Sequence, residues 1–128
     1  MDHSEITERV LAAARNLATL SSGEVWVLRE REVMPRAGLI ATETSDEAKA
    51  NVDAAVAELA EAGVKAHGMV RNTIYGYAGR EIVEDAKAHD VGVIIMGSRG
   101  RGDLAGLVPG STAHKVIHLA DRPVLVVR

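Results

Sequence analysis

Along this chain, segments with the periodicity of amphipathic helices alternate with short runs of apolar residues. We expect helices at residues 4–20, from about 44 to 62, at 77–88 and at 111–119, because apolar side chains recur in each at helical spacing. The runs between them, at 25–28, 64–70, 91–96 and 124–127, are apolar and short enough for buried strands. Strands that alternate with helices predict a parallel, doubly wound α/β sheet with right-handed crossovers.

Local signals set several boundaries of these elements. Thr44 followed by Glu47 three residues later is typical of a capping box, and Gly63 stands where a helix-ending glycine belongs. The charged run 29–32 is expected to interrupt the strand after Leu28, and 34–39 is expected to be a loop. Gly79 should weaken its helix by roughly 1 kcal/mol relative to alanine.

Composition excludes several classes of protein. The 128 residues fit one domain, residues 1–128. The chain has no Phe, one Trp and two Tyr, so the core must consist of Ala, Val, Leu and Ile, and stacking platforms for single-stranded nucleic acid are not expected. The net charge is -3, and the basic residues are scattered. A nucleic-acid partner is therefore not predicted.

Cofactor chemistry and targeting are also limited by the sequence. The chain has no Cys, which excludes disulfides, thiolate nucleophiles and Cys-ligated zinc. His114 and His118 are four residues apart, but no third ligand stands nearby, so we expect no metal site. The amino-terminal residues lack the pattern of a signal peptide, and no apolar run could span a bilayer. We therefore expect a cytoplasmic protein with no membrane partner.

A glycine-rich segment follows the most apolar predicted strand. It runs from Gly97 through Gly100 to Gly110, and Ser111-Thr112 then opens a helix. Glycines let the backbone turn and approach a ligand, and the free N–H groups at a helix start bind anions. The segment thus suits phosphate binding, although turn glycines followed by an N-cap serine would look alike. It is not a Walker loop, because no Lys follows the last glycine.

The spacing of this segment resembles the nucleotide motif of ATP-binding universal stress proteins. In that motif, two residues separate the first glycine from the second glycine. Nine residues separate the second glycine from a third, which is followed by serine or threonine. In this chain the motif residues are Gly97, Gly100, Gly110 and Ser111. The flanking runs 94–100 and 123–127 resemble the family's fourth and closing strands, and 80–83 resembles its third helix. The resemblance extends over essentially the whole chain.

The resemblance implies a ligand and a set of contacts. The ligand would be ATP, or ADP or AMP, with Mg²⁺. Ser111 and Thr112 would bind phosphate, and the backbone of Met96 and Gly97 would lie near the ribose. Arg99, like Arg101, is either a phosphate ligand or a solvated loop charge. The implied binding set is Asp2, Met96, Gly97, Arg99, Gly100, Gly110, Ser111 and Thr112.

The amino-terminus departs from the family pattern. Family members begin with an apolar strand that ends in an aspartate, and here only that ending, Asp2-His3-Ser4-Glu5, is present. Asp2 is either the adenine contact or an N-cap. The missing strand is central in the family. We therefore expect either that a strand from a neighbouring chain replaces it or that the second strand shifts against the fourth.

The resemblance implies a regulatory homodimer that binds ATP. Its subunits would pair through the apolar edge strand 124–127, with strand exchange as a further option. A nucleotide-free dimeric scaffold of the same fold is the alternative. No general base is evident in the glycine-rich segment, so catalysis beyond slow hydrolysis is not predicted. The serine- and glycine-rich loop of adenylating enzymes is absent.

Overall fold

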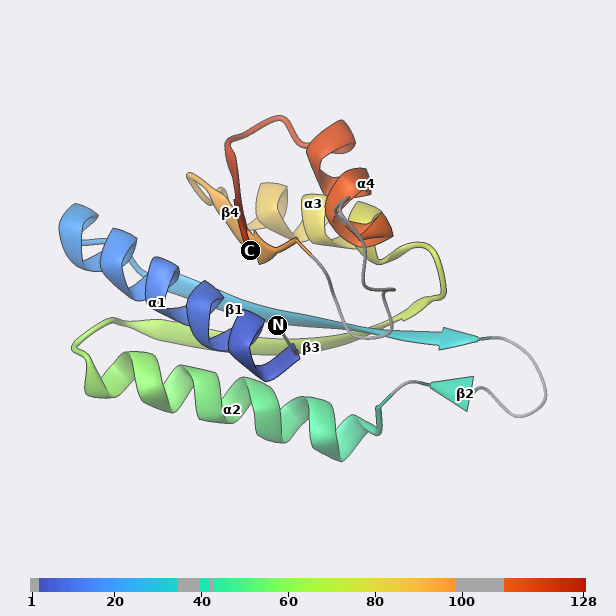
Figure 1. Cartoon of the computed structure of the whole chain (residues 1–128), viewed down its shortest axis with the longest axis horizontal. Helices are drawn as coiled ribbons and strands as arrows, with labels where there is room; N and C mark the ends of the chain where they lie inside the picture. The colour runs from blue at the N-terminus through green and yellow to red at the C-terminus, as the bar shows by residue number, and fades with distance from the viewer. Residues whose placement is uncertain (1–2, 35–39, 42, 99–109) are drawn as a thin grey trace.

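The computed structural model describes residues 3–34, 40, 41, 43–98 and 110–128. Parallel strands alternate with helices, which confirms the α/β class (Figure 1). The elements in chain order are α1 (His3–Ser21), β1 (Val25–Met34), β2 (Ile40–Ala41), α2 (Ser45–Glu61), β3 (Ala66–Ile74), α3 (Ala78–Ala88), β4 (Ile94–Gly97), α4 (Ser111–Leu119) and β5 (Val124–Val127).

The strands form two sheets. One has the order β2-β1-β3, with β1 and β3 parallel and β2 antiparallel at the end of β1. The other consists of β4 and β5, which are parallel. Among the described residues, β1 and β4 are not paired with each other. The alternative in which the second strand shifts against the fourth is therefore wrong for this structure. Among the described residues, one edge of β4 has no strand partner, and one edge of β1 is paired only with β2, at Val33 and Met34.

The described residues form two apolar cores, each beside a different sheet. Beside the sheet of β1 and β3, Ala18 of α1 packs with Leu59 of α2 and with Val64, against Val25 and Val27 of β1. Beside the sheet of β4 and β5, residues of α3 and α4 pack with residues of these two strands. The buried members of this second core are Val83, Ala86, Ile94 and Val116. Both cores lack aromatic side chains, as composition required.

Strand β1 continues to Met34, so the expected interruption after Leu28 is wrong. The charged run alternates in step with the pleat, which places Arg29 and Arg31 on one face and Glu30 and Glu32 on the other. Each face supplies polar partners, and β1 pairs with β3 from Val25 to Val33. The charges therefore fit a strand because residues distant in sequence bind them.

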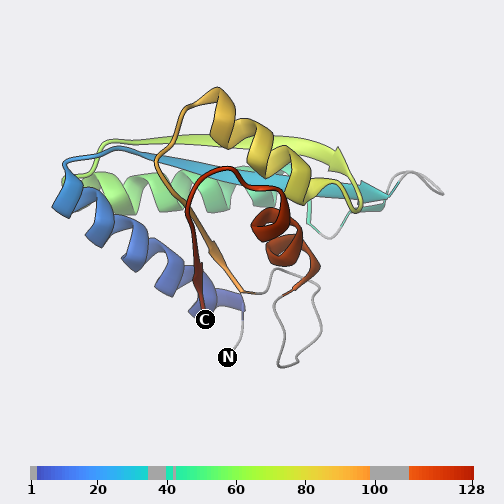
Figure 2. The same ribbon diagram turned by 90° about the horizontal axis from the view of Figure 1, so that it is seen from above.

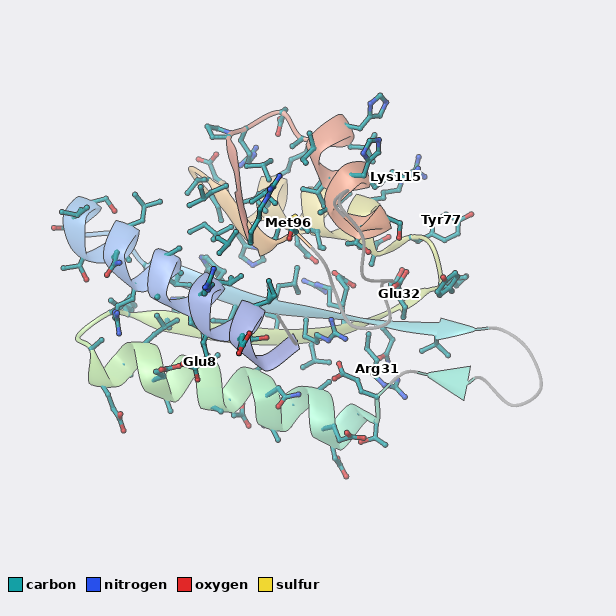
Figure 3. The ribbon with its side chains drawn as sticks, viewed as in Figure 1. Glu8, Arg31, Glu32, Tyr77, Met96 and Lys115 are labelled. Atoms are coloured by element: carbon teal, nitrogen blue, oxygen red, sulfur yellow. The ribbon has the colours of Figure 1, made fainter. Side chains whose placement is uncertain are left out.

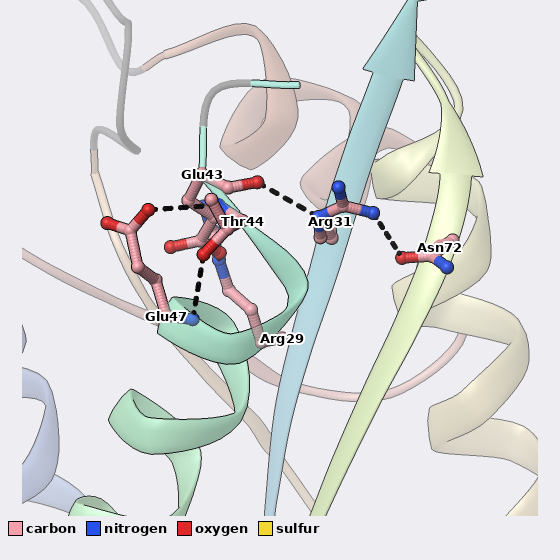
Figure 4. Close-up of polar contacts among 6 residues, drawn as sticks. All are labelled: Arg29, Arg31, Glu43, Thr44, Glu47 and Asn72. Carbon is pink, nitrogen blue, oxygen red and sulfur yellow. Dashed lines mark hydrogen bonds and ion pairs between the residues drawn. The ribbon is translucent and has the colours of Figure 1, made fainter. Parts of the chain in front are cut away.

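Helix α2 begins as its capping pattern predicts. The hydroxyl of Thr44 accepts the backbone N–H of Glu47 at 3.0 Å, and the Glu47 carboxylate accepts the N–H of Thr44 at 3.1 Å (Figure 4). Gly63, just beyond the helix, has a φ of 83°, a left-handed conformation that glycine adopts without strain. Of the described helices, none is long and apolar enough to cross a membrane.

Candidate functional site

Backbone hydrogen bonds hold the two ends of the glycine-rich segment together. At the carboxyl end of β4, the N–H of Ser98 donates to the carbonyl oxygen of Val127 at 2.8 Å. The carbonyl of Ser98 in turn accepts the N–H of Gly110. Gly110, the residue before α4, therefore lies directly beside the end of β4, as a site at the carboxyl edge of parallel strands requires.

Within the described residues, no side chain caps the amino-terminal end of α4. Gly110 is the N-cap residue and offers no side chain to the first N–H groups of the helix, and the first turn contains no acidic residue. The side chain of Ser111 is exposed, and that of Thr112 is half-buried. Free N–H groups, the positive end of the helix dipole and two hydroxyls can together bind a phosphate group.

The predicted residues divide into those the structure places and those it does not describe. It brings Gly97, Gly110 and Ser111 to one edge of the β4–β5 sheet. The half-buried side chain of Met96 packs against the core formed by α3, α4 and β4 (Figure 3). The other predicted contacts, Asp2, Arg99, Gly100 and Arg101, lie outside the described residues.

Helix α1 starts near the same edge. The Nη1 atom of Arg9 donates to the carbonyl oxygen of Arg128 at 2.9 Å, which ties the first part of α1 to the chain beyond β5. Figure 2 shows the beginning of α1 and the carboxyl end of β5 on the same side of the molecule.

A polar cluster at the carboxyl half of β1 lies outside the predicted binding set. Arg29 forms an ion pair with the buried carboxylate of Glu43. Arg31 donates from Nε to the Glu43 carbonyl at 2.9 Å and from Nη1 to Asn72 Oδ1 at 3.0 Å (Figure 4). The alternating charges were the available signal, and their partners lie elsewhere in sequence.

Other parts of the described chain do not compete as sites. A shallow groove between α2 and β3 contains none of the predicted residues, and Lys49 and Asp53 at its rim form an exposed ion pair at 2.7 Å. Within the described ranges, no three side chains of His, Asp or Glu are grouped so as to hold a metal ion. His114 and His118 are both exposed on α4.

Comparisons with known proteins place the chain among relatives of one family. The sequence model of the universal stress protein family matches residues 1–128. Universal stress protein MJ0577 of Methanocaldococcus jannaschii is 31% identical, with 99% of this chain and 90% of the relative covered. Universal stress protein YxiE of Bacillus subtilis is 31% identical, with 100% and 95% covered. The structure of the universal stress protein from Archaeoglobus fulgidus in complex with dAMP has a TM-score of 0.74 and 26% identity, with 100% and 90% covered.

Proposed function

The chain belongs to the universal stress protein family, and we propose that it is a regulatory protein that binds ATP, with Mg²⁺, at the start of α4. The observation that carries the proposal is the uncapped amino-terminus of α4, held beside the carboxyl end of β4 by the Gly110–Ser98 hydrogen bond. A phosphate group would complete the hydrogen bonding of the first turn.

Each residue of the proposed site has a distinct role. The N–H groups and hydroxyls of Ser111 and Thr112 bind phosphate oxygens, and Gly97 and Gly110 leave room for the nucleotide to approach the backbone. Gly100 shapes the segment between them, and the guanidinium of Arg99 adds a charge-assisted contact to phosphate. The backbone of Met96 borders the ribose, and Asp2 contacts adenine.

A homologous structure supports an adenine nucleotide as the ligand. The related protein from Archaeoglobus fulgidus was solved with dAMP, and its fold matches along the whole of this chain. ADP and AMP share the adenosine and phosphate that this site would bind, so they are expected to compete with ATP. We propose binding rather than catalysis as the role, because the sequence of the glycine-rich segment offers no evident general base.

We further propose that the protein is a cytoplasmic homodimer joined through β5. Strand β5 pairs with β4 along one edge, and among the described residues its other edge has no strand partner. Leu125 of this strand is 43% exposed. An apolar edge strand favours pairing with a second copy of itself.

Strands β1 and β4, which are not paired with each other among the described residues, favour a second candidate function. This function is that of a dimeric scaffold that binds no nucleotide. If a strand of another chain enters between β1 and β4, assembly could be the role of the protein without any ligand. The two functions are separated by a direct affinity measurement.

Titration calorimetry with ATP and Mg²⁺ tests the proposed function. Replacing Gly110 by Val should block approach to the backbone and weaken binding at least tenfold, which corresponds to about 1.4 kcal/mol. Gly92→Val is the matched control, because a Cβ at Gly92, before β4, meets no atom within 4 Å. Equal affinity in the two variants would refute the assignment of the site, and absence of binding to the unaltered chain would favour the scaffold.

A further inference from the structure

Helix α3 joins the two sheets through two different kinds of contact. Its apolar side, with Val83 and Ala86, packs in the core shared with α4 and β4. Its other side faces β1 and β3 with acidic residues, Glu81 and Asp85. Since β1 and β4 are not paired with each other among the described residues, α3 is one of the elements that hold the two sheets together.

Three contacts attach α3 and its flanking residues to β1. At one end, the ring of His89 lies 4.1 Å from that of Trp26. At the other, the N–H of Gly76, before α3, donates to Glu32 Oε2 at 2.7 Å. Figure 3 shows Glu32 near this end of α3, beside Tyr77. Between them lie Glu30 of β1 and Asp85 of α3, which we call the acid pair.

The acid pair is buried, and three of its four oxygens lack a partner among the described residues. Glu30 is only 5% exposed, and the Asp85 side chain is 12% exposed. In the part of the chain that the structure describes, both carboxylate oxygens of Glu30 and the Oδ2 atom of Asp85 are buried without a hydrogen-bond partner. Buried oxygens of this kind normally have partners, so these three indicate that a hydrogen lies between the two side chains.

One cation already balances one of the two charges. Arg71, directly opposite Glu30 in the β1–β3 ladder, places its Nε atom 2.8 Å from Asp85 Oδ1. Arg71 and Asp85 thus neutralise each other, and the second carboxyl group, Glu30, remains. The half-buried Glu81, one helical turn before Asp85, adds a further negative charge nearby. A second ionised carboxylate would therefore be both desolvated and repelled.

We propose that Glu30 and Asp85 together bind one proton, and that this proton controls the attachment of α3 to β1 and β3. The protonated Glu30 carboxyl donates from one of its oxygens to Asp85 Oδ2, so one hydrogen bond gives a partner to two of the three oxygens without another ligand. Loss of the proton leaves two adjacent carboxylates at the junction and loosens α3 from β1. The attachment of α3 to α4 is apolar and does not depend on the proton.

The direction of the expected pH dependence follows from the burial of Glu30. Burial, together with the adjacent Asp85, raises the pKa of Glu30 from 4.5 to about 8. The folded chain therefore holds a proton that the unfolded chain releases above its ordinary pKa. Stability contributed by this group is fully present below pH 4.5 and is lost progressively as the pH rises to about 8.

Denaturant unfolding from pH 5 to 9 tests the proposal on the whole chain. Relative to Glu30→Gln, whose amide replaces the protonated acid and does not titrate, the unfolding constant of the unaltered chain should rise about tenfold per pH unit up to about pH 8. Glu84→Gln is the control, because Glu84 is an exposed acid of the same helix. It should retain the pH dependence, and identical profiles for the unaltered chain and Glu30→Gln would overturn the proposal.

A second measurement remains decisive if Glu30→Gln does not fold. Carbon-detected NMR of the glutamate carboxyl groups in the unaltered chain should show one that titrates well above pH 6. Hydrogen exchange of α3 amides should accelerate over the same pH range, while that of α2 amides, corrected for intrinsic rates, should not. If every glutamate carboxyl titrates near its ordinary pKa, the proton site does not exist.

Discussion

Gly79 of α3 lies so close to Lys115 of α4 that a Cβ atom built on Gly79 would stand 2.8 Å from the Cβ of Lys115. The backbone oxygen of Thr112 would be 3.3 Å from the Cβ atom built on Gly79. The missing side chain therefore allows α3 and α4 to pack closely. Because Thr112 belongs to the first turn of α4, this contact also helps to position the candidate phosphate site.

Gly79→Ala should consequently destabilise the protein, although alanine is the better helix former. The steric conflict is expected to cost about 1–3 kcal/mol, and the gain in helix propensity is about 1 kcal/mol. Urea unfolding measures the balance, with Gly92→Ala as a control that should change stability by less than about 0.5 kcal/mol. A Gly79→Ala variant more stable than the unaltered chain would show that α4 moves away at no cost.

The helices and strands near strong local signals were predicted well. The boundaries of α4 and β5 match the predicted ones, because Gly110-Ser111 and Pro123 mark them within a few residues of sequence. The capping box at Thr44 is confirmed for the same reason. In the candidate site, the meeting of Gly97, Gly110 and Ser111 was predictable from the order of strand, glycine-rich segment and helix.

Features that depend on distant residues were not predictable. The extent of β1 depends on Glu43 and on the N–H of Gly76, which bind charges of the run 29–32 from outside this strand. The close packing that Gly79 allows depends on Lys115 of α4. Helix propensity alone therefore predicted only that Gly79 weakens its helix. The division into two sheets also escaped prediction, since pairing between strands is decided by the whole fold.

Val126→Pro is expected to abolish the proposed dimer without unfolding the subunit. The carbonyl groups of Pro123 and Val127 accept hydrogen bonds from β4, so by the alternation of a parallel ladder the N–H of Val126 points to the open edge. Proline there removes only an outward donor. Sedimentation velocity at tens of micromolar should show a dimer for the unaltered chain and a monomer for the variant.

Leu125→Pro is the matched comparison, because the N–H of Leu125 points toward β4 by the same alternation. It should damage the fold as well as the dimer, as circular dichroism would report. Pairing through β5 would be contradicted if the unaltered chain is monomeric at these concentrations. It would also be contradicted if the Val126→Pro variant still dimerises.

The unpaired edges of β1 and β4 make strand exchange testable at single amides. The N–H of Val25 donates to Lys65 and that of Ile94 to Pro123, so the N–H groups of Leu28 and Ile95 point to the open edges. If a strand from a second copy enters between the sheets, hydrogen exchange at Leu28 and Ile95 should slow as protein concentration rises. Exchange at these two amides that is independent of concentration would exclude this form of assembly.

The most direct test of the central claim is an amide NMR titration with ATP and Mg²⁺. If the start of α4 binds phosphate, the N–H resonances of Ser111 and Thr112 should show large shifts that saturate with nucleotide. The first-turn amides of α2, which begins with its own capping box, serve as the internal reference and should not shift. Saturable binding that leaves the amides of Ser111 and Thr112 unchanged would contradict the account.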